Sequence, residues 1–184
     1  ILSGANITID DTKETLHEGL LVSGDAFRVL GIDAVLRSAM PTAATTNAAP
    51  PVMVISYSYW QVRFAGDPAV MGKVVSVNHV PLTIVGVMPA SYRGLALAAG
   101  PAGPDFTAPL ALAGALRGDG DAVRRPGWNW LEIMGRLKPG ATMTQLRDNL
   151  EAPFIASVKE TLSQSSDLPH LRVTAGGTGR TEAD

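Results

Sequence analysis

Apolar and polar residues alternate in the first part of the chain in the manner of strands. Within residues 1–22, Ile7 and Ile9 alternate with polar neighbours, and an apolar run follows a charged stretch. Further along, VMVIS, residues 52–56, is a short apolar run of the kind found in buried strands. Both segments are therefore predicted to contain strands.

The stretch after this apolar run has the start, face and end of a short helix. Ser56 or Ser58 stands where a side-chain oxygen can cap the first turn. Trp60 and Phe64 lie four residues apart and therefore share one face of the helix. Gly66 follows at the position where a helix end favours a left-handed residue.

A second helical turn and a hairpin are predicted directly afterwards. Asp67-Pro68 combines a capping side chain with proline at the first helical position, where the missing N–H costs nothing. Residues 74–77 and 82–87 have strand patterns on either side of Asn78-His79, which we expect to form the turn. Helix, turn and hairpin together specify a shape, and the stretch offers no reactive cluster.

Shorter elements and loops are expected around this block. Ser23 or Asp25 is placed to cap a short helix over residues 26–32. Residues 37–51 contain three prolines and no apolar period, which predicts a loop or an ordered arm. Residues 105–118 have the pattern of a strand followed by a helix within a region rich in Gly, Ala and Pro.

The C-terminal part is predicted to hold a strand, a long helix and a closing strand. Residues 130–137 alternate as a strand does. Thr142 and Gln145 have the spacing of a capping box at the start of a helix over about 142–162. Residues 171–175 are predicted to form the closing strand.

The long helix carries an apolar stripe and one interior proline. The stripe is spaced by fours and predicts a core-facing seam made of Leu146, Leu150, Phe154, Val158 and Leu162. Pro153 lies inside the helix, where a proline costs about 3 kcal/mol. We therefore expect a kink or a break at this residue.

Composition restricts the possible function classes. The 184 residues are 46% hydrophobic and carry a net charge of −2, so a folded core is expected and nucleic acid is not an expected partner. The absence of cysteine excludes disulfides, thiolate metal sites and a cysteine nucleophile. The longest apolar tract, residues 108–116, is about half of the roughly 20 residues that span a bilayer. The segment as given is therefore expected to be soluble, as an excised domain is.

No group of side chains has the spacing of a catalytic or metal site. His17, His79 and His170 fall in separate segments without a ligand spacing, and Asp10-Asp11 lies in a polar stretch expected to be exposed. There is no Gly-x-Ser-x-Gly elbow and no phosphate-binding glycine motif in its required context. We therefore predict no catalytic residue, no metal and no cofactor.

Two tryptophans are the candidate contact residues. Trp128 and Trp130 alternate around Asn129, so one is expected to face inward and the other to lie at a surface. An exposed tryptophan is a frequent anchor in protein contacts. The sequence offers no stronger candidate for a binding residue.

Four segments follow, in order, the pattern of one known family. VSGDAFRVLGI, residues 22–32, is similar to its first block. Residues 52–89 repeat its order of strand, Ser-Tyr, Trp, Arg-Phe, Asp-Pro, hairpin and Gly-Val-x-Pro. Residues 131–150 resemble its later strand, Lys-Pro-Gly turn and helix, and residues 173–180 resemble the start of its closing segment. Together they resemble the extracytoplasmic core domain of MacB-type ABC transporter permeases, including duplicated orphan permeases.

The chain departs from the family pattern at three places. LRSAM, residues 36–40, stands where the family continues with Leu-Gly-Arg and an aromatic residue. Asn78-His79 replaces the usual Asn-Gly turn, which removes the easy positive φ of glycine. Pro153 in the late helix is also unusual. None of these positions is catalytic, because the resemblance implies no catalytic residue in this domain.

The resemblance implies an α+β fold, with one MacB-like periplasmic core domain over residues 1–184 and two lobes. Residues 1–36 with 128–175 are expected to form a βαβ-type lobe similar to the porter domains of efflux pumps. Residues 50–127 are expected to form an inserted mixed lobe.

The resemblance also implies a role and a location. It implies a non-catalytic domain of an ABC-transporter-type permease on the extracytoplasmic (periplasmic) side of the bacterial inner membrane, where it couples membrane-helix motion to a periplasmic substrate or partner. The implied partners are the protein's own transmembrane helices, an ATPase subunit or domain, a periplasmic adaptor protein and a second copy in a homodimer. The alternative is a stand-alone extracytoplasmic domain that binds a ligand or peptide in a cleft around Trp128 and Trp130.

Overall fold

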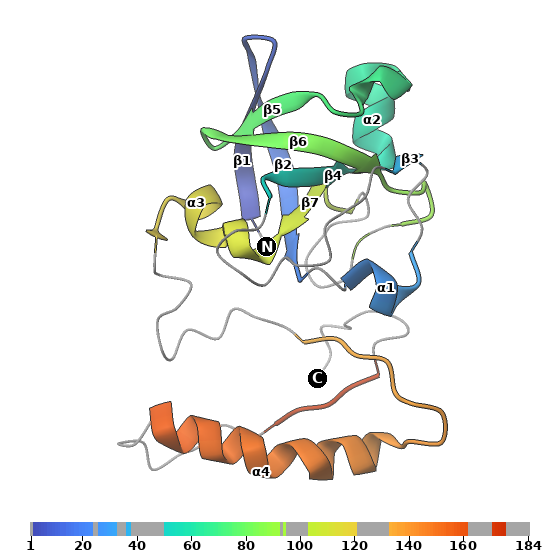
Figure 1. Ribbon diagram of the computed structural model, residues 1–184, viewed down its shortest axis with the longest axis vertical. Helices are drawn as coiled ribbons and strands as arrows, with labels where there is room; N and C mark the ends of the chain where they lie inside the picture. The colour runs from blue at the N-terminus through green and yellow to red at the C-terminus, as the bar shows by residue number, and fades with distance from the viewer. Residues whose placement is uncertain are drawn as a thin grey trace. The chain divides into compact units, whose positions relative to one another are not determined.

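The computed structural model of the chain is shown in Figure 1. It describes residues 2–23, 26–32, 36–37, 50–92, 94, 103–120, 133–161 and 171–175. Contacts divide the chain into two compact units, Ile1–Val123 and Arg124–Asp184. The first unit contains a seven-stranded sheet, and the second contains the long helix α4 (Met143–Thr161).

The described part of the first unit alternates strands with short helices. Its elements are β1 (Leu2–Ile9), β2 (Thr12–Val22), α1 (Ala26–Leu30), β3 (Leu36–Arg37), β4 (Val52–Ile55), α2 (Tyr57–Phe64), the 3-10 helix η1 (Pro68–Val70), β5 (Val74–Val77), β6 (Val80–Val87), β7 (Phe106–Pro109), the 3-10 helix η2 (Leu110–Leu112) and α3 (Ala113–Arg117). The strands, short helices and hairpin predicted for this part of the chain are therefore confirmed. The mixture of helix and strand agrees with the expected α+β class.

Pairing between strands closes most of the sheet into a ring. The strand order is β3-β6-β4-β7-β2-β1-β5, and β5 also pairs with β6. The pairs β2–β7 and β4–β6 are parallel, and the others are antiparallel. Because β5 pairs with both β1 and β6, all strands except β3 lie in a closed circuit. The closure is short at two places, because β1 pairs with β5 only at Ile7 and Thr8, and β2 pairs with β7 only over residues 19–22.

The sheet joins segments that the sequence analysis assigned to different lobes. β1 and β2 belong to residues 1–36, and they pair with β5 and β7 of residues 50–127. These two segments therefore fold as one sheet. The grouping of residues 128–175 with residues 1–36 is not tested by these pairings and stays a prediction.

Two tight turns of the same kind connect the antiparallel hairpins. The φ angles are 47° and 63° at Asp10 and Asp11, and 48° and 68° at Asn78 and His79. Positive φ at both central residues is the mark of a type I′ turn, which matches the twist of the flanking strands. Asn78 is held further, because its N–H donates to the Asn6 carbonyl (2.7 Å) and its Oδ1 accepts from the Asn6 N–H (2.8 Å). The expected turn therefore forms without glycine.

The sheet buries a core of branched and aromatic side chains. Those exposed by 2% or less include Ile7, Ile9, Leu16, Val75, Val77, Leu82, Ile84 and Phe106. A second cluster consists of Val52, Val54, Val85 and Met88, with Phe27, Ile32 and Tyr92 packed against it. All four residues of β4 are buried, which confirms that the apolar run forms a buried strand.

Local capping fixes the ends of α2 as the sequence predicts. Ser56, rather than Ser58, caps the helix, because its Oγ accepts the N–H of Tyr59 at 3.1 Å. The left-handed conformation begins at Ala65 (φ 52°) and continues at Gly66 (φ 73°). Ala65 is therefore the C-cap of α2, one residue before Gly66, the residue at which the sequence predicts the helix end.

Trp60 attaches α2 to the segment that follows it. Its side chain is buried at 8% exposure, and its Nε1 donates to the carbonyl of Asp67 at 2.9 Å. The Tyr57 ring meets it edge-on at 5.6 Å between centroids. One residue thus joins the helix face, the turn after it and the core.

The second unit confirms the predicted cap of the long helix and corrects two other expectations about it. Thr142 and Gln145 exchange reciprocal hydrogen bonds of 3.0 and 3.2 Å, which form the capping box. The helix continues through Pro153, so it has no break at this residue, and the alternative of a kink stays a prediction. The stripe is only partly covered: Leu150 is 42% exposed, Leu146, Phe154 and Val158 are half-buried, and Leu162 lies outside the described residues.

Two predicted strands are wrong where the structure describes them. Residues 133–137 and residues 171–175 have no regular secondary structure. Ile133 is 97% exposed and Met134 is 37% exposed, so the alternation in this segment is not matched by burial. An alternating pattern needs a partner strand and a covering layer to form a sheet. The loop or ordered arm predicted over residues 37–51 stays a prediction, because residues 38–49 lie outside the described residues.

Gly19 is required where β2 and β7 lie side by side. A Cβ at Gly19 would lie 2.3 Å from the tip of the buried Phe106 ring. Gly19→Ala is therefore expected to lower the free energy of unfolding by about 1–3 kcal/mol, the usual cost of overpacking. Urea denaturation measures it. Gly135→Ala is the control, because a Cβ there meets no atom within 4 Å; equal stability of the two variants would contradict the prediction.

Trp60 is expected to contribute more to stability than any exposed residue of the same helix. Trp60→Ala removes a buried ring and a hydrogen bond, so the free energy of unfolding should fall by about 3–5 kcal/mol. Val62→Ala, at a side chain that is 89% exposed, should change it by less than about 0.5 kcal/mol. A loss below about 1 kcal/mol for the tryptophan variant would show that its burial matters little.

Candidate functional site

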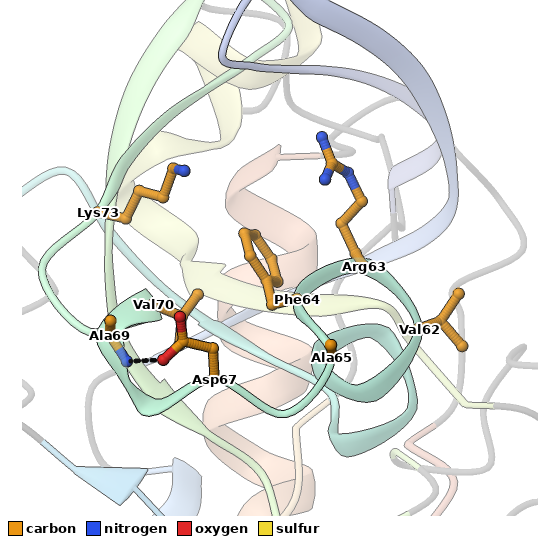
Figure 2. A pocket seen from close by; sticks show the side chains of 8 residues that line it. All are labelled: Val62, Arg63, Phe64, Ala65, Asp67, Ala69, Val70 and Lys73. Carbon is orange, nitrogen blue, oxygen red and sulfur yellow. Dashed lines mark hydrogen bonds between the residues drawn. The ribbon is translucent and has the colours of Figure 1, made fainter.

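A shallow pocket lies where α2 ends and the chain turns through η1 to β5. It encloses about 390 Å³ and is lined by Val62, Arg63, Phe64, Ala65, Asp67, Ala69, Val70 and Lys73 (Figure 2). Of these residues only Val70 is buried, and the others are half-buried or exposed. Ala65, the C-cap of α2, and Asp67, the N-cap of η1, are among these residues, so two of the capping residues also shape the pocket.

Two cationic side chains flank an aromatic ring in the pocket. The guanidinium carbon of Arg63 is 5.7 Å from the centre of the Phe64 ring, and Lys73 Nζ is 6.0 Å from it. Figure 2 shows the two side chains on opposite sides of this ring. Both separations are within the range of cation–π attraction. Tyr59 meets the same ring edge-on at 6.1 Å, which holds the ring in place.

Carboxylates of the β1–β2 hairpin hold both cations. Glu14 Oε1 accepts from Arg63 Nε at 2.9 Å and from the Tyr59 hydroxyl at 2.6 Å. Asp10 Oδ2 accepts from Lys73 Nζ. The Asp10 side chain is 71% exposed, so its ion pair is expected to be weak. The hairpin is therefore tied to the pocket by one partly buried network and one exposed pair.

Asp67, the third charged side chain of the pocket lining, caps the 3-10 helix η1. Asp67 Oδ1 accepts the N–H of Ala69 at 2.8 Å, which caps η1 ahead of Pro68. The predicted cap is thereby confirmed. Each of the three charged side chains in the pocket lining therefore has a partner within the protein: Arg63 pairs with Glu14, Lys73 pairs with Asp10, and Asp67 caps η1.

Burial shifts the ionisation of two tyrosines. Desolvation first, and then the hydrogen bond to the Glu14 carboxylate, raises the pKa of the Tyr59 hydroxyl far above its ordinary value. Desolvation raises the pKa of Tyr92 to about 12. Tyr59 therefore stays a neutral donor to Glu14 throughout the physiological range.

The pocket lining offers two cations, one carboxylate and apolar side chains, and it contains no histidine. No group of three or more His, Asp or Glu residues that could hold a metal occurs among the described residues. His17 and His79 are both exposed and lie apart from the pocket lining, and His170 falls outside the described residues. Within the described ranges no helix is long and apolar enough to cross a membrane.

The structure does not place the contact residues that the sequence analysis named. Trp128 and Trp130 lie outside the described residues, so their role stays a prediction. Sequence reasoning missed Arg63, Phe64 and Lys73 as a group. These three residues lie within one short stretch of sequence, which is a signal that could have indicated the group. The carboxylates that bind the two cations, Glu14 and Asp10, are about 50 to 60 residues away, so no local pattern indicated them.

The raised tyrosine pKa values predict a loss of stability in alkaline solution. A hydroxyl that holds its proton more tightly in the folded state stabilises that state fully below the unfolded pKa of about 10. The free energy of unfolding should therefore fall as pH rises above about 10, because the unfolded chain ionises and the folded chain does not. Denaturation at several pH values measures the slope. Tyr59→Phe should reduce it, and an ordinary spectroscopic pKa for both hydroxyls would contradict the prediction.

Comparison with known proteins gives a family and several solved structures that are similar to this chain. Residues 2–152 match the family described as the MacB-like periplasmic core domain. A comparison with curated proteins finds no match. The crystal structure of the periplasmic region of MacB from Actinobacillus actinomycetemcomitans is similar with a TM-score of 0.57 and 14% identity, covering 90% of this chain and 74% of that one.

Two further solved structures are similar. A domain assigned to a permease protein from Porphyromonas gingivalis has a TM-score of 0.52 and 17% identity, covering 91% of this chain and 70% of that one. The extracellular domain of the ABC-type transporter YknZ from Gram-positive bacteria has a TM-score of 0.45 and 11% identity, covering 63% of this chain and 55% of that one.

The family match extends over most of the chain and includes the sheet, the pocket and the first part of α4. Domains of this family are periplasmic parts of transporter permeases and are in general not catalytic. Membrane helices and an ATPase are accordingly their working partners. The chain belongs to the MacB-like periplasmic core domains, on the extracytoplasmic side of the membrane as part of an ABC transporter permease.

Proposed function

We propose that this domain couples motion of the permease's membrane helices to a periplasmic substrate or partner protein. The observation that carries the proposal is the closed circuit of strands, in which β5 pairs with both β1 and β6. A closed, hydrogen-bonded sheet with a close-packed interior resists deformation. Such a body can pass displacement from one end to the other without losing it in internal bending.

The first strand is suited to receive a load. β1 pairs with β2 from Leu2 opposite Gly19 to Ile9 opposite Thr12, and its second edge pairs with β5 at Ile7. A pull along β1 would act across these hydrogen bonds, which are perpendicular to the strands, and would load many of them together. We propose that a membrane helix of the permease delivers the motion at this position.

The same proposal includes two further partners. The domain is proposed to act as a homodimer within the full transporter and to meet a periplasmic adaptor protein. Trp128 and Trp130 are proposed as contact residues for one of these partners. Family membership favours this role over a stand-alone ligand-binding domain, because membrane helices are the working partners of domains in this family.

A rigid coupling domain should move relative to the membrane as nucleotide binds, without changing its internal distances. The test uses the full-length permease with its ATPase in lipid nanodiscs. The domain has no cysteine, so Val62→Cys introduces a single label site within it. Energy transfer from this label to acceptor lipids is expected to change between the nucleotide-free and ATP-bound states.

An internal distance provides the control. Labels at Val62 and Val74, which are 89% and 60% exposed, report on the sheet unit alone. Their separation, measured by electron spin resonance, is expected to stay the same in both nucleotide states. Unchanged energy transfer to the membrane, or a nucleotide-dependent separation of this pair, would overturn the coupling proposal.

A further inference from the structure

We propose that the junction between β1 and β5 is the place where the closed sheet opens, and that hydrogen bonds of the Asn78 side chain keep it closed. The junction lies between two hairpins, β1–β2 and β5–β6. Opening there separates two intact hairpins and converts the closed circuit into an open sheet. If the domain couples motion as proposed above, the strength of this junction limits the load that it can transmit.

The junction contains few strand pairs. β1 and β5 are in register at Ile7 with Val77 and at Thr8 with Ser76, which makes two pairs. β1 forms seven pairs with β2, and β5 forms four with β6. Each strand is therefore bound more extensively to its own hairpin partner than to its neighbour across the junction.

The other junction of the circuit with two pairs is better protected from water. β4 and β7 also form two pairs, but all residues of both strands are buried. Thr8 and Ser76 are half-buried. A backbone group that is released near water regains a hydrogen bond, whereas one released inside a core loses it. The β1–β5 junction is therefore expected to open more easily than the β4–β7 junction.

Burial and one side chain hold the β1–β5 junction closed. The side chains of Ile7 and Val77 are 0% exposed, so the open form, which uncovers them, is a minor population. Asn78 directly follows β5, and its Oδ1 accepts the Asn6 N–H at 2.8 Å. Its Nδ2 donates to the Leu116 carbonyl at 2.8 Å, which orients the amide group. The Asn78 side chain thus ties the end of β5 to both β1 and α3.

Further side chains act beside the junction. Lys73 precedes β5 and forms an ion pair with Asp10, which follows β1. The Asp10 side chain is 71% exposed, so this pair is expected to contribute little. Glu14 ties β2 to α2 through Arg63 and Tyr59. Contacts between the β1–β2 hairpin and the chain from α2 to β5 are therefore made largely by side chains.

Native-state hydrogen exchange, followed by NMR on the 184-residue chain, tests the proposal. The Asn6 N–H is bonded across the β1–β5 junction and reports on it. The Ser56 N–H donates to the Asp105 carbonyl at 2.8 Å and reports on β4 and β7, and the Met88 N–H donates to the Ile55 carbonyl at 2.9 Å and reports on β4 and β6. The protection factor of Asn6 is expected to be at least about tenfold lower than those of the two reference amides, Ser56 and Met88.

Asn78→Gly removes the side-chain bonds and keeps the turn, because glycine suits the positive φ of 48° at this residue. Exchange at the registered pair Thr8 and Ser76, which the substitution leaves untouched, is expected to become about tenfold faster, and exchange at the reference amides should change less. His79→Gly is the matched control, because it changes an exposed side chain in the same turn, at a φ of 68°. It should change exchange at the registered pair by less than about threefold.

Lys73→Gln tests the other end of the junction and should accelerate exchange of the registered pair by less than about fivefold. A larger effect of this variant than of Asn78→Gly would overturn the role assigned to Asn78. Equal acceleration of all amides in the Asn78 variant would indicate global unfolding and overturn the proposal. Equal protection of Asn6 and the two reference amides in the unchanged protein would also overturn it, and this result needs no variant that folds. None of these measurements involves a membrane or a nucleotide, so the coupling proposal is tested separately.

Discussion

The pairing of β5 with two different strands is the constraint on which the first unit depends. It joins β1, at the start of the chain, to β6, and so converts a row of strands into a circuit. Asn78 secures this junction, because it exchanges hydrogen bonds with Asn6 and donates through Nδ2 to the Leu116 carbonyl at 2.8 Å. One turn residue thus connects β1, the β5–β6 hairpin and α3, and its positive φ is held by these contacts rather than by glycine.

The candidate site depends on the same architecture. The pocket is made by a continuous piece of chain, but its cations are oriented by carboxylates of the β1–β2 hairpin. The hairpin can reach them because β1 lies next to β5 in the sheet. Tyr59 contributes a neutral hydroxyl at 2.6 Å from Glu14, and desolvation keeps that hydroxyl protonated. The positions of the charged side chains at the pocket therefore depend on the closure of the sheet.

Sequence reasoning succeeded where the decisive interactions are local and failed where they are distant. The Ser56 cap, the Asp67-Pro68 turn and the Thr142–Gln145 capping box involve residues at most three apart, so their spacing is visible in the sequence. The parallel pairing of β2 with β7 and the contact of Gly19 with Phe106 are set by packing between segments far apart, which no local pattern encodes. The strand patterns at 130–137 and 171–175 failed for the converse reason, since the described parts of both segments carry the local pattern but form no strand.

The order of strands in the ring has a consequence for how the protein is made. β2 lies near the start of the chain, yet its parallel neighbour β7 ends at Pro109. The circuit therefore cannot close until Pro109 has been synthesised and delivered to the place where the domain folds. Until then β1 and β2 lack their partners in the sheet, and unpaired strand edges and uncovered apolar side chains promote association with other chains. Sheets built from such distant pairings also fold slowly. The early strands are therefore the part of this domain that most needs protection during biogenesis.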